Sequence, residues 1–179
     1  MKPQIVPEAA VSPAQDAAIR AGLCICFPPD YAIFSRTRAW HGSLPAWSVL
    51  VIGGESVVAH GGIVEREILV GLKRVRIAGV QNVFVLPEFR GRGLFRQVMS
   101  AAINEARRRG LDFGLLFCTP EIGRKYARQG WQRLYRRNVT RIDEEGRPQP
   151  LPAKNVTLYY PLANRRMPPG DLDLLGNDW

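Results

Sequence analysis

The chain has 179 residues, of which 46% are apolar and 23% are charged, and its formal net charge is +9. This length suits one domain over residues 1–179, with a buried core large enough to be stable without disulfide bonds or metal ions. The sequence has no apolar run of the length that spans a membrane, and its first residues lack the apolar core of a signal peptide. We therefore expect no membrane span and a cytoplasmic location. The positive charge indicates an anionic partner: nucleic acid, a membrane surface or a phosphorylated cofactor.

The cysteines give no sign of a disulfide framework or a metal site. Cys24, Cys26 and Cys118 form no CxxC pair, and no cluster of histidine and cysteine accompanies them. Inert thiols are the simpler interpretation, and we expect no metal.

The first half of the chain predicts a short edge strand around Ile5, then a helix that begins at Ser12 and Pro13. This helix should end before Pro28, and a second short helix is expected within residues 30–40. Strands are expected at 47–52, 56–67 and 74–86, the first two joined by a glycine turn. The aromatic residues of segment 31–47 either line an apolar cavity or pack on the core, and the sequence leaves both open.

The second half predicts an amphipathic helix over residues 92–109, stopped by Gly110, and a fully apolar strand over 111–118. A short helix at 121–128, a strand at 131–140, a surface loop at 143–150 and a strand at 155–162 should follow. The tail from residue 167 is rich in proline and glycine and should be irregular. A strand–helix–strand crossover within a meander of strands indicates a mixed α/β fold.

The most informative stretch runs from Val83 to Trp131, and its first part carries an anion-binding pattern. An apolar strand ends in Arg90-Gly91-Arg92-Gly93, and the amphipathic helix follows directly. Glycine lets a backbone approach an anion closely, and the first turn of a helix offers unpaired amides and partial positive charge. Guanidinium groups beside such a turn suit phosphate oxygens. The stretch therefore predicts an anion-binding loop.

This stretch resembles the coenzyme A signature of the GNAT acetyltransferase superfamily, Arg/Gln-x-x-Gly-x-Gly/Ala. Arg90 and Gly93 match it, whereas Phe95 departs from its last position. The segment from Lys125 to Trp131 is similar to a second family motif, a tyrosine followed four residues later by glycine and an aromatic residue. The resemblance implies a GNAT fold: a mixed, mostly antiparallel sheet flanked by helices, with strands splayed at the acyl-CoA site.

The resemblance also implies roles for individual residues, with acetyl-CoA as the co-substrate. Phe84 and Val85 would hydrogen-bond the pantetheine arm, and Tyr126 would be the general acid that protonates the departing thiolate. A phenol is chemically suited to that step. The pyrophosphate would be held by backbone amides of Arg90, Gly91, Arg92, Gly93, Leu94 and Phe95.

A narrower resemblance concerns the acceptor side. The stretch from Arg38-Ala39-Trp40-His41-Gly42 through Ala59-His60, with the closing Asn177-Asp178-Trp179, is similar to the aminoglycoside 2′-N-acetyltransferases. The middle region is similar to the rhizobial nodulation N-acyltransferase. The resemblance implies that Asp178 and the terminal carboxylate of Trp179 hold acceptor amines, with Asp30 as a further candidate.

One departure concerns the general base. Those enzymes have a glutamate where this chain has Gln81, and an amide cannot accept the proton. The sequence leaves several substitutes open: Glu65, Glu67, Asp178, the chain terminus and His60. The charge of +9 also fits poorly with a polycationic acceptor unless the cleft is locally acidic.

We therefore expect an N-acetyltransferase that moves an acetyl group from acetyl-CoA to a primary amine of a small molecule, with an aminoglycoside-like amino sugar as one option. The first alternative is an N-acyltransferase with a longer acyl donor on coenzyme A or a carrier protein, for which residues 31–47 would form the acyl pocket. The second is a non-catalytic nucleic-acid-binding module, which leaves the Tyr126 motif unexplained. A membrane partner is not expected, and a homodimer is left open.

Overall fold

The computed structural model describes residues 1–54, 56–163 and 165–179 and divides into two compact units. The first unit comprises Met1–Trp40, Leu44–Val64 and Val80–Glu105. The second comprises His41–Ser43, Glu65–Gly79 and Ala106–Trp179. The chain crosses between the units within two long strands, β3 (Ser56–Val70) and β4 (Lys73–Val85), and within the helix α3 (Leu94–Arg108).

The sheet of the first unit begins with β1 (Gln4–Pro7) at its edge. β1 pairs antiparallel with β2 (Trp47–Gly53), which pairs antiparallel with β3, and β4 lies next to β3. The expected edge strand at the N-terminus is thus confirmed. The inner strands are apolar because both of their faces are covered, and Trp47, Val49 and Leu50 are fully buried.

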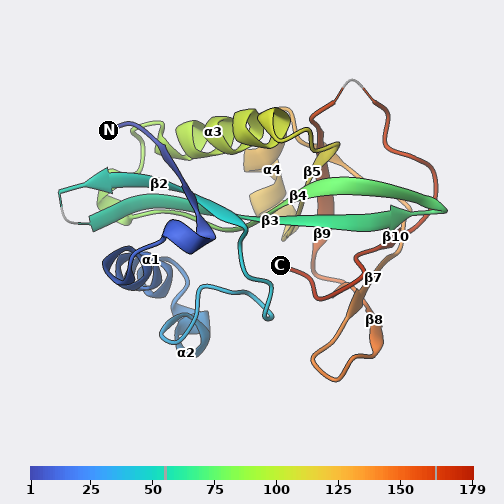
Figure 1. Cartoon of the computed structure of the whole chain (residues 1–179), viewed down its shortest axis with the longest axis horizontal. Helices are drawn as coiled ribbons and strands as arrows, with labels where there is room; N and C mark the ends of the chain where they lie inside the picture. The colour runs from blue at the N-terminus through green and yellow to red at the C-terminus, as the bar shows by residue number, and fades with distance from the viewer. Residues whose placement is uncertain (55, 164) are drawn as a thin grey trace. The chain divides into compact units, whose positions relative to one another are not determined.

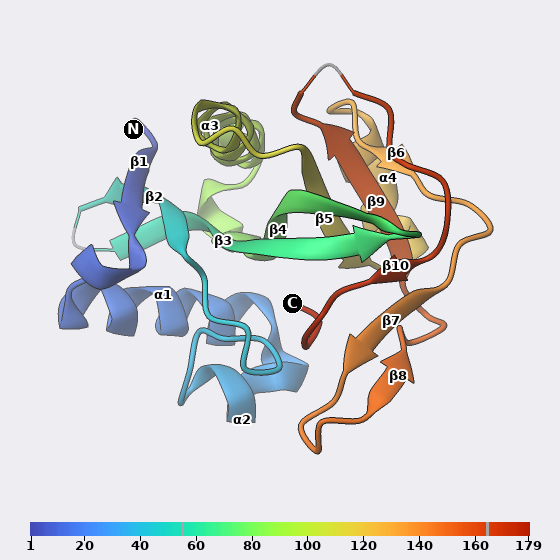
Figure 2. The ribbon, with the colours of Figure 1, turned by 45° about the vertical axis from the view of Figure 1, so that its right-hand side comes forward.

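Helices α1 (Pro13–Cys26) and α3 lie on opposite faces of this sheet in Figures 1 and 2. Ser12 begins α1 through a capping box with Gln15, in which each side chain accepts a hydrogen bond from the other residue's backbone. Gly22 of α1 leaves the space that the ring of Phe84 on β4 occupies. Short helical turns complete this unit: η1 (Glu8–Ala10), η2 (Pro28–Asp30), α2 (Tyr31–Phe34) and η3 (Pro87–Phe89).

The second unit holds a sheet in the order β6-β9-β5-β4-β3-β10-β7-β8. The pairs β4–β5 and β7–β10 are parallel, whereas β5–β9, β6–β9, β7–β8 and β3–β10 are antiparallel. Helix α4 (Pro120–Ala127) packs on β9 through Gly123. The strands are β5 (Phe113–Cys118), β6 (Gln132–Arg133), β7 (Val139–Ile142), β8 (Pro148–Pro150), β9 (Val156–Pro161) and β10 (Leu172–Asp173). The predicted mixed α/β fold is confirmed.

The parallel pairing of β4 with β5 is short. Its register covers Ile77 to Gly79 on β4 and Phe113 to Leu115 on β5. Both strands continue beyond these residues, β4 to Val85 and β5 to Cys118. The described pairing therefore ends at Gly79 and Leu115, which agrees with the expectation of splayed strands.

Several expected elements were wrong in extent. The helix expected within 30–40 is only the turn α2, and further on the side chain of Thr37 accepts a hydrogen bond from the N–H of Ala39, which competes with helix formation. The strand expected at 131–140 is split into β6 and β7, with Arg136 at a φ of 54° between them. The helix expected from residue 92 begins at Leu94, because Gly93 has a left-handed backbone.

Two short strands also lie where none was expected. β8 forms inside the loop at 143–150, where Asp143 accepts backbone hydrogen bonds from Glu145 and Arg147 and so closes a hairpin with β7. β10 forms in the tail because Leu172 and Asp173 fit between β3 and β7.

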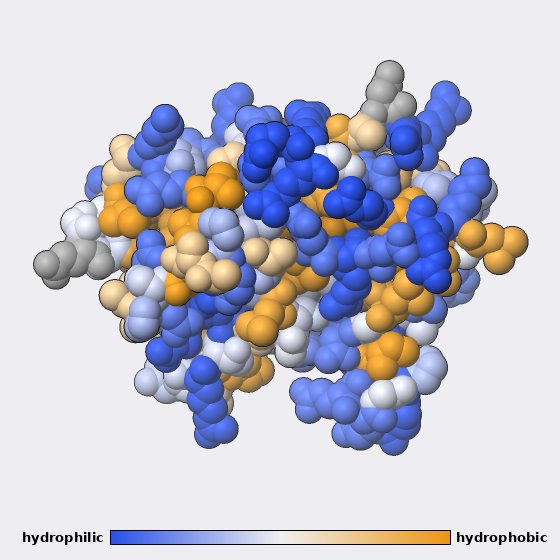
Figure 3. Space-filling view, viewed as in Figure 1, coloured by the Kyte–Doolittle hydropathy of each residue, from blue (hydrophilic) through white to orange (hydrophobic). Residues whose placement is uncertain are grey.

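Hydrophilic residues cover most of the face seen in Figure 3, and apolar residues appear there in separate patches. None of the helices that the structure describes is long and apolar enough to cross a membrane.

Candidate active site

The predicted anion-binding loop lies in the first unit, after η3 and before α3. Gly91 and Gly93 have φ angles of 76° and 74°, a left-handed conformation that costs other residues about 1–2 kcal/mol. Within the described chain, no atom lies within 4 Å of the place that a Cβ would take at either glycine. The glycines are therefore required by the backbone rather than by crowding, and the surface above them is open to a ligand.

The loop continues directly into the first turn of α3. The N–H of Gln97 donates to the carbonyl of Gly93 at 3.1 Å, so the helical ladder starts from the loop itself. A helix N-terminus carries partial positive charge and directs amide N–H groups outward along its axis. Leu94 anchors this turn because its side chain is only 3% exposed.

The two loop arginines are tied back onto the preceding turn. Arg90 donates from Nε to the carbonyl of Val85 at 3.1 Å, and Arg92 donates from Nη2 to the carbonyl of Glu88 at 3.1 Å. The guanidinium of Arg92 also lies over the ring of Phe89, 5.1 Å from its centroid. These contacts are to uncharged groups, so they hold both guanidinium groups beside the glycines without an opposing charge.

At the end of β4, the backbone groups of Phe84 and Val85 face opposite edges of the strand. The N–H of Leu86 donates to the carbonyl of Val58 on β3 at 2.9 Å, so the backbone of Leu86 faces β3. Strand residues alternate, so the backbone of Phe84 also faces β3 while that of Val85 faces the other edge. The backbone of Val85 is therefore the one of the two that faces this edge, and the contacts of Phe84 and Val85 with pantetheine stay predictions.

Asn82 introduces an irregularity in β4 that the sequence reasoning missed. Its φ is 53°, a left-handed value inside a strand, and asparagine is among the few residues that tolerate it. Its side chain donates to the carbonyl of Arg38 at 2.7 Å, which holds the residue in this conformation. Such an irregularity redirects the backbone groups of the residues that follow.

His60 is a buried neutral histidine beside this irregularity. Nδ1 lies 2.8 Å from the carbonyl of Asn82 and must therefore be the donor, and Nε2 lies 3.2 Å from the hydroxyl of Ser48. The ring stacks on Phe84 with centroids 5.5 Å apart. Burial lowers the pKa of His60 to about 4 and outweighs the hydrogen bond to Asn82, which acts in the opposite direction. His60 is thus a structural residue, and this position does not favour its use as a general base.

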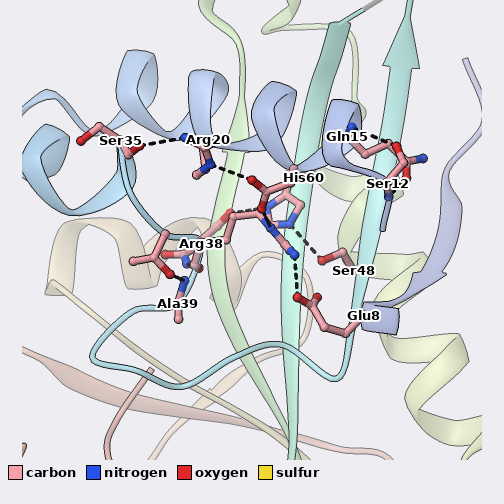
Figure 4. A network of polar contacts seen from close by, with 12 residues as sticks. Glu8, Ser12, Gln15, Arg20, Ser35, Arg38, Ala39, Ser48 and His60 are labelled. Atoms are coloured by element: carbon pink, nitrogen blue, oxygen red, sulfur yellow. Dashed lines mark hydrogen bonds and ion pairs between the residues drawn. The ribbon is translucent and has the colours of Figure 1, made fainter. Parts of the chain in front are cut away.

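A network around Arg38 supports this region (Figure 4). Arg38 is buried and pairs with Glu8 and Asp16, each at 2.6 Å. Arg20 pairs with Asp16 at 2.7 Å and donates to the carbonyl of Ser35 at 2.8 Å. These contacts join the N-terminal segment, α1 and the segment after α2.

Gln81 lies beside this network and is also buried, at 4% exposure. Its carbonyl oxygen accepts hydrogen bonds from the N–H of Trp40 and from the side chain of Asn82, both at 3.3 Å. The side-chain amide of Gln81 is therefore engaged in hydrogen bonds within the first unit.

Tyr126, the predicted general acid, lies on α4 in the second unit. Its ring is 7% exposed and meets Trp131 edge to face, with centroids 5.9 Å apart. Burial, and secondarily the charge of a nearby Cys118 thiolate, raises the pKa of Tyr126 above its ordinary value. Burial also raises the pKa of Cys118 to about 11. Both groups are therefore protonated near neutral pH, so the phenol is in the state that a proton donor requires.

The C-terminal residue Trp179 fills the point where β4 and β5 part. Its Nε1 donates to the carbonyl of Leu115 at 3.4 Å, and its ring occupies the space in front of Gly79, where a Cβ would approach to 2.4 Å. Phe117 lies 5.1 Å from the ring between centroids, and the guanidinium of Arg66 lies 5.4 Å from its centroid. The end of the chain is thus part of the second unit's core.

Asp178 is buried at 2% exposure and is paired within the second unit. Its Oδ1 lies 2.7 Å from Nδ1 of His41 and 3.4 Å from Nη1 of Arg141. The carboxylate therefore already faces an imidazole and a guanidinium group of its own chain. Its predicted contact with an acceptor amine stays a prediction.

Two other predicted substitutes for a general base lie in ion pairs of the second unit. Glu65 pairs with Arg109 at 3.0 Å, and Glu67 pairs with Arg74 on the exposed surface. Asp30 is partly exposed and directly precedes α2 in the first unit. Among the described residues, no group of three or more histidine, cysteine, aspartate or glutamate side chains could hold a metal ion.

Solved structures of similar fold come from several bacteria. A GNAT family acetyltransferase from Brucella melitensis, in complex with acetyl-CoA, has a TM-score of 0.61 at 20% identity, with 95% of this chain and 94% of that chain covered. The GNAT family N-acetyltransferase YhbS from Escherichia coli, in complex with CoA, gives 0.62 at 14% identity, with 97% and 90% covered. A GCN5-related N-acetyltransferase from Kribbella flavida gives 0.54 at 20% identity, with 74% covered, and this chain spans only 33% of that protein.

No curated protein sequence matches the chain. The family described as "Acetyltransferase (GNAT) domain" matches residues 26–134, which include β4, the Arg90–Gly93 loop, α3 and the Tyr126 motif. This match extends over more than half of the sequence. The chain therefore belongs to the GNAT acetyltransferase family and is an acyltransferase.

Proposed function

We propose that the protein transfers an acetyl group from acetyl-CoA to the primary amine of a small molecule. The observation that carries this proposal is the loop at the start of α3, where Gly91 and Gly93 are left-handed and open to a ligand. Arg90 and Arg92 add charge that suits a pyrophosphate. The complexes of two similar structures with acetyl-CoA and CoA support the same ligand.

In this proposal the backbone amides from Arg90 to Phe95 hold the pyrophosphate, and Val85 holds the pantetheine arm from the edge of β4. A backbone N–H redirected by the irregularity at Asn82 polarises the carbonyl. Acetyl-CoA supplies the activated thioester. Tyr126, kept protonated by its burial, donates its proton to the departing sulfur.

The acceptor is proposed to be a cationic amine, with an aminoglycoside-like amino sugar as one member of that class. Asp30, Gln81, Asp178 and Trp179 remain the sequence-based candidates for holding it. Gln81 and Asp178 are both engaged within the fold. Recognition of a positive charge would therefore rely on further acidic residues.

The longer-acyl alternative has no structural observation in its favour. Its pocket was to be built from aromatic residues 31–47, but Phe34 is 1% exposed and packs against Phe27 and Trp40, and Trp47 is fully buried. These rings form the core of the first unit. Membership of an acetyltransferase family also goes against the non-catalytic nucleic-acid module.

The proposal is tested by calorimetric titration with acetyl-CoA and by a thiol-release assay with a panel of amino sugars, aminoglycosides and polyamines. We expect acetyl-CoA to bind and to raise the melting temperature, and free thiol to appear only when an accepted amine is present. Mass spectrometry of the product with acetyl-CoA and longer acyl-CoAs identifies the acyl group. If acetyl-CoA neither binds nor supports acylation of any amine, the proposal is wrong.

A further inference from the structure

The second unit carries two adjoining cavities whose linings are rich in arginine. The larger has a volume of about 870 Å³ and the smaller one of about 290 Å³. Leu134 and Arg137 line both, so the cavities meet along the segment that follows β6. Figure 2 shows β6 beside β9, and their pairing places Gln132 opposite Tyr159. Together the arginines of the two linings form the arginine surface: Arg107, Arg133, Arg136, Arg137, Arg165 and Arg166.

The charge of the arginine surface is only partly offset. Among the described residues that line the two cavities, none is an aspartate or a glutamate. Arg165 pairs with Asp112 at 3.1 Å. Hydrogen bonds from Asn138 and, to a smaller extent, the charge of Arg137 lower the pKa of Asp171, so a second carboxylate lies near the surface. Two carboxylates do not balance six guanidinium groups, and the surface therefore attracts anions.

Two of the arginines are held in place by carbonyl groups that use only part of their donors. Arg137 donates from Nη1 to the carbonyl of Pro168 at 2.6 Å, and Arg107 donates from Nε to the carbonyl of Leu162 at 3.4 Å. A guanidinium group has five N–H donors, and each of these contacts uses one. The other donors suit phosphate oxygens, which a guanidinium group binds through two parallel hydrogen bonds.

The turn between β6 and β7 presents two neighbouring arginines in an uncommon conformation. Arg136 has a φ of 54°, and Arg137 directly follows it. A left-handed backbone is unfavourable for arginine, which lacks the short polar side chain that lets asparagine adopt it. Strained residues of this kind cluster at binding sites. The strain therefore agrees with a binding role for this turn.

Two tyrosine rings accompany the arginine surface. Tyr135 lines the smaller cavity and is 69% exposed, and the guanidinium of Arg133 lies over its ring, 5.0 Å from the centroid. Tyr159 lines the larger cavity, where its hydroxyl donates to the side chain of Gln132 at 2.6 Å. Each nucleobase has a flat face that stacks on aromatic rings and on guanidinium planes.

This combination of groups favours one kind of anion. Free phosphate would use the arginines but neither tyrosine ring, and a single nucleotide has only one base for the two rings. A single strand of nucleic acid repeats phosphate and base along its length, which matches charge and rings spread over two adjoining cavities. In a duplex the bases stack on one another and pair, so their faces are not offered to side chains.

We propose that the arginine surface binds a single strand of nucleic acid, with phosphates on the guanidinium groups and bases on Tyr135 and Tyr159. The inference goes beyond acetyl transfer and does not rest on it. It gives the enzyme a nucleic-acid partner in addition to coenzyme A, unlike the non-catalytic module. It also accounts for part of the net charge of +9, of which the loop at the start of α3 uses only Arg90 and Arg92.

Fluorescence anisotropy with a labelled uridine strand of about 15 nucleotides tests the proposal. We expect the logarithm of the binding constant to fall linearly with the logarithm of salt concentration, by about 0.7 for each phosphate bound and up to about 4 for six. A duplex of the same length should bind more weakly. Equal binding of the duplex, stronger binding of phosphatidylserine vesicles, or binding of inorganic pyrophosphate without the strand overturns the single-strand assignment.

Acetyl-CoA distinguishes the arginine surface from the loop at the start of α3. Among the described residues, none from Arg90 to Phe95 lines either cavity. The strand should therefore stay bound when acetyl-CoA is added at tenfold its own Kd. Displacement of the strand would place it at the loop and would refute the surface.

Tyr135→Ala tests the stacking, with Tyr31→Ala as its matched control. Tyr31 is 61% exposed and belongs to the first unit. Loss of one base–aromatic stack should weaken strand binding by about 5–150-fold in Tyr135→Ala, and the control should bind as wild type does. Both variants should keep the melting temperature of wild type, because both rings are exposed. The stacking is refuted if neither variant loses affinity or if both lose it equally.

Arg166→Glu tests the charge, with Arg36→Glu as its matched control. Both arginines are exposed, and Arg36 belongs to the first unit and lines neither cavity. Arg166→Glu should weaken strand binding by about 10–150-fold and reduce the salt dependence by about 0.7, while both variants keep the wild-type Kd for acetyl-CoA. The two variants have the same net charge. Equal losses of strand affinity would mean that net charge alone governs binding, which overturns the site.

Discussion

Substituting Gly93 by alanine should lower both the stability of the fold and the affinity for acetyl-CoA, and a matched control can separate the two effects. Gly93 has a φ of 74°, and no described atom stands where the methyl group of alanine would lie. The cost is therefore conformational, about 1–2 kcal/mol of folding free energy. For a chain of 179 residues, this corresponds to a fall in melting temperature of about 2–8 °C.

Gly110 provides a matched control at the other end of the same helix. Its φ is 70°, and again no described atom lies within 4 Å of its Cβ position. Gly110→Ala should therefore lower the melting temperature by a similar amount. It should leave acetyl-CoA binding unchanged, because Gly110 ends α3 whereas Gly93 begins it.

Gly93→Ala should weaken the binding of acetyl-CoA because the backbone of the alanine relaxes from its strained, left-handed φ. An alanine that moves toward negative φ rotates the neighbouring amides away from the pyrophosphate. Loss of one hydrogen bond to a charged group is worth about 1.5–3 kcal/mol, or about 10–150-fold in Kd. Calorimetric titration with acetyl-CoA measures both variants at the same temperature and salt concentration. The reasoning is refuted if Gly93→Ala binds as tightly as wild type, or if both variants lose affinity equally.

Other expectations concern the acid, the buried histidine and the arginine network. Tyr126→Phe should lower kcat by about 10²–10⁴-fold with no change in the Kd for acetyl-CoA, as steady-state kinetics and calorimetry would show; an unchanged kcat removes the general-acid role. The pKa of His60 is about 4 when folded and 6.5 when unfolded, so its contribution of about 3 kcal/mol is present above pH 6.5 and is lost as pH falls toward 4. Urea unfolding at pH 7 and pH 5 should show about 2 kcal/mol of this loss, and His60→Gln should reduce it. Arg38→Met should destabilise the fold by about 3 kcal/mol, because Glu8 and Asp16 lose a buried partner. Equal unfolding free energies of wild type and Arg38→Met at pH 7 would contradict this. Burial raises the pKa of Asp16, but hydrogen bonds from Arg20 and Arg38 outweigh it and lower the pKa below its ordinary value. Acid should therefore remove part of the stability of wild type below about pH 4, and should remove less of the stability of Arg38→Met.

The sequence predicted the loop and its flanking elements well because their signals are local. An apolar strand, a glycine-rich turn and an amphipathic helix each depend on neighbouring residues. Their bounds moved by only a few positions, and the later start of α3 follows from the left-handed Gly93. The family resemblance added roles that composition and periodicity do not provide. The pantetheine contacts that it assigned to Phe84 and Val85 stay predictions.

The features that sequence reasoning missed depend on contacts between distant residues. His41 and Asp178 are 137 positions apart, and no periodic pattern connects them. β10 and β8 are too short to have a pattern of their own and form because neighbouring strands offer an edge. Asn82 could have been suspected, since asparagine accepts a left-handed backbone, but an isolated asparagine is not enough to locate an irregular strand.

The protonation states of the buried residues restrict which side chain can be the general base. Tyr126 holds its proton because its pKa is raised, so it can serve as an acid but not as a base at neutral pH. His60 is neutral, and burial lowers its pKa to about 4, while Nδ1 donates to the carbonyl of Asn82 and Nε2 lies 3.2 Å from the hydroxyl of Ser48, so this position does not favour acceptance of a proton. The side-chain amide of Gln81 cannot accept a proton. Among the sequence-based candidates for the general base, Glu65, Glu67, Asp178 and the terminal carboxylate therefore stay predictions.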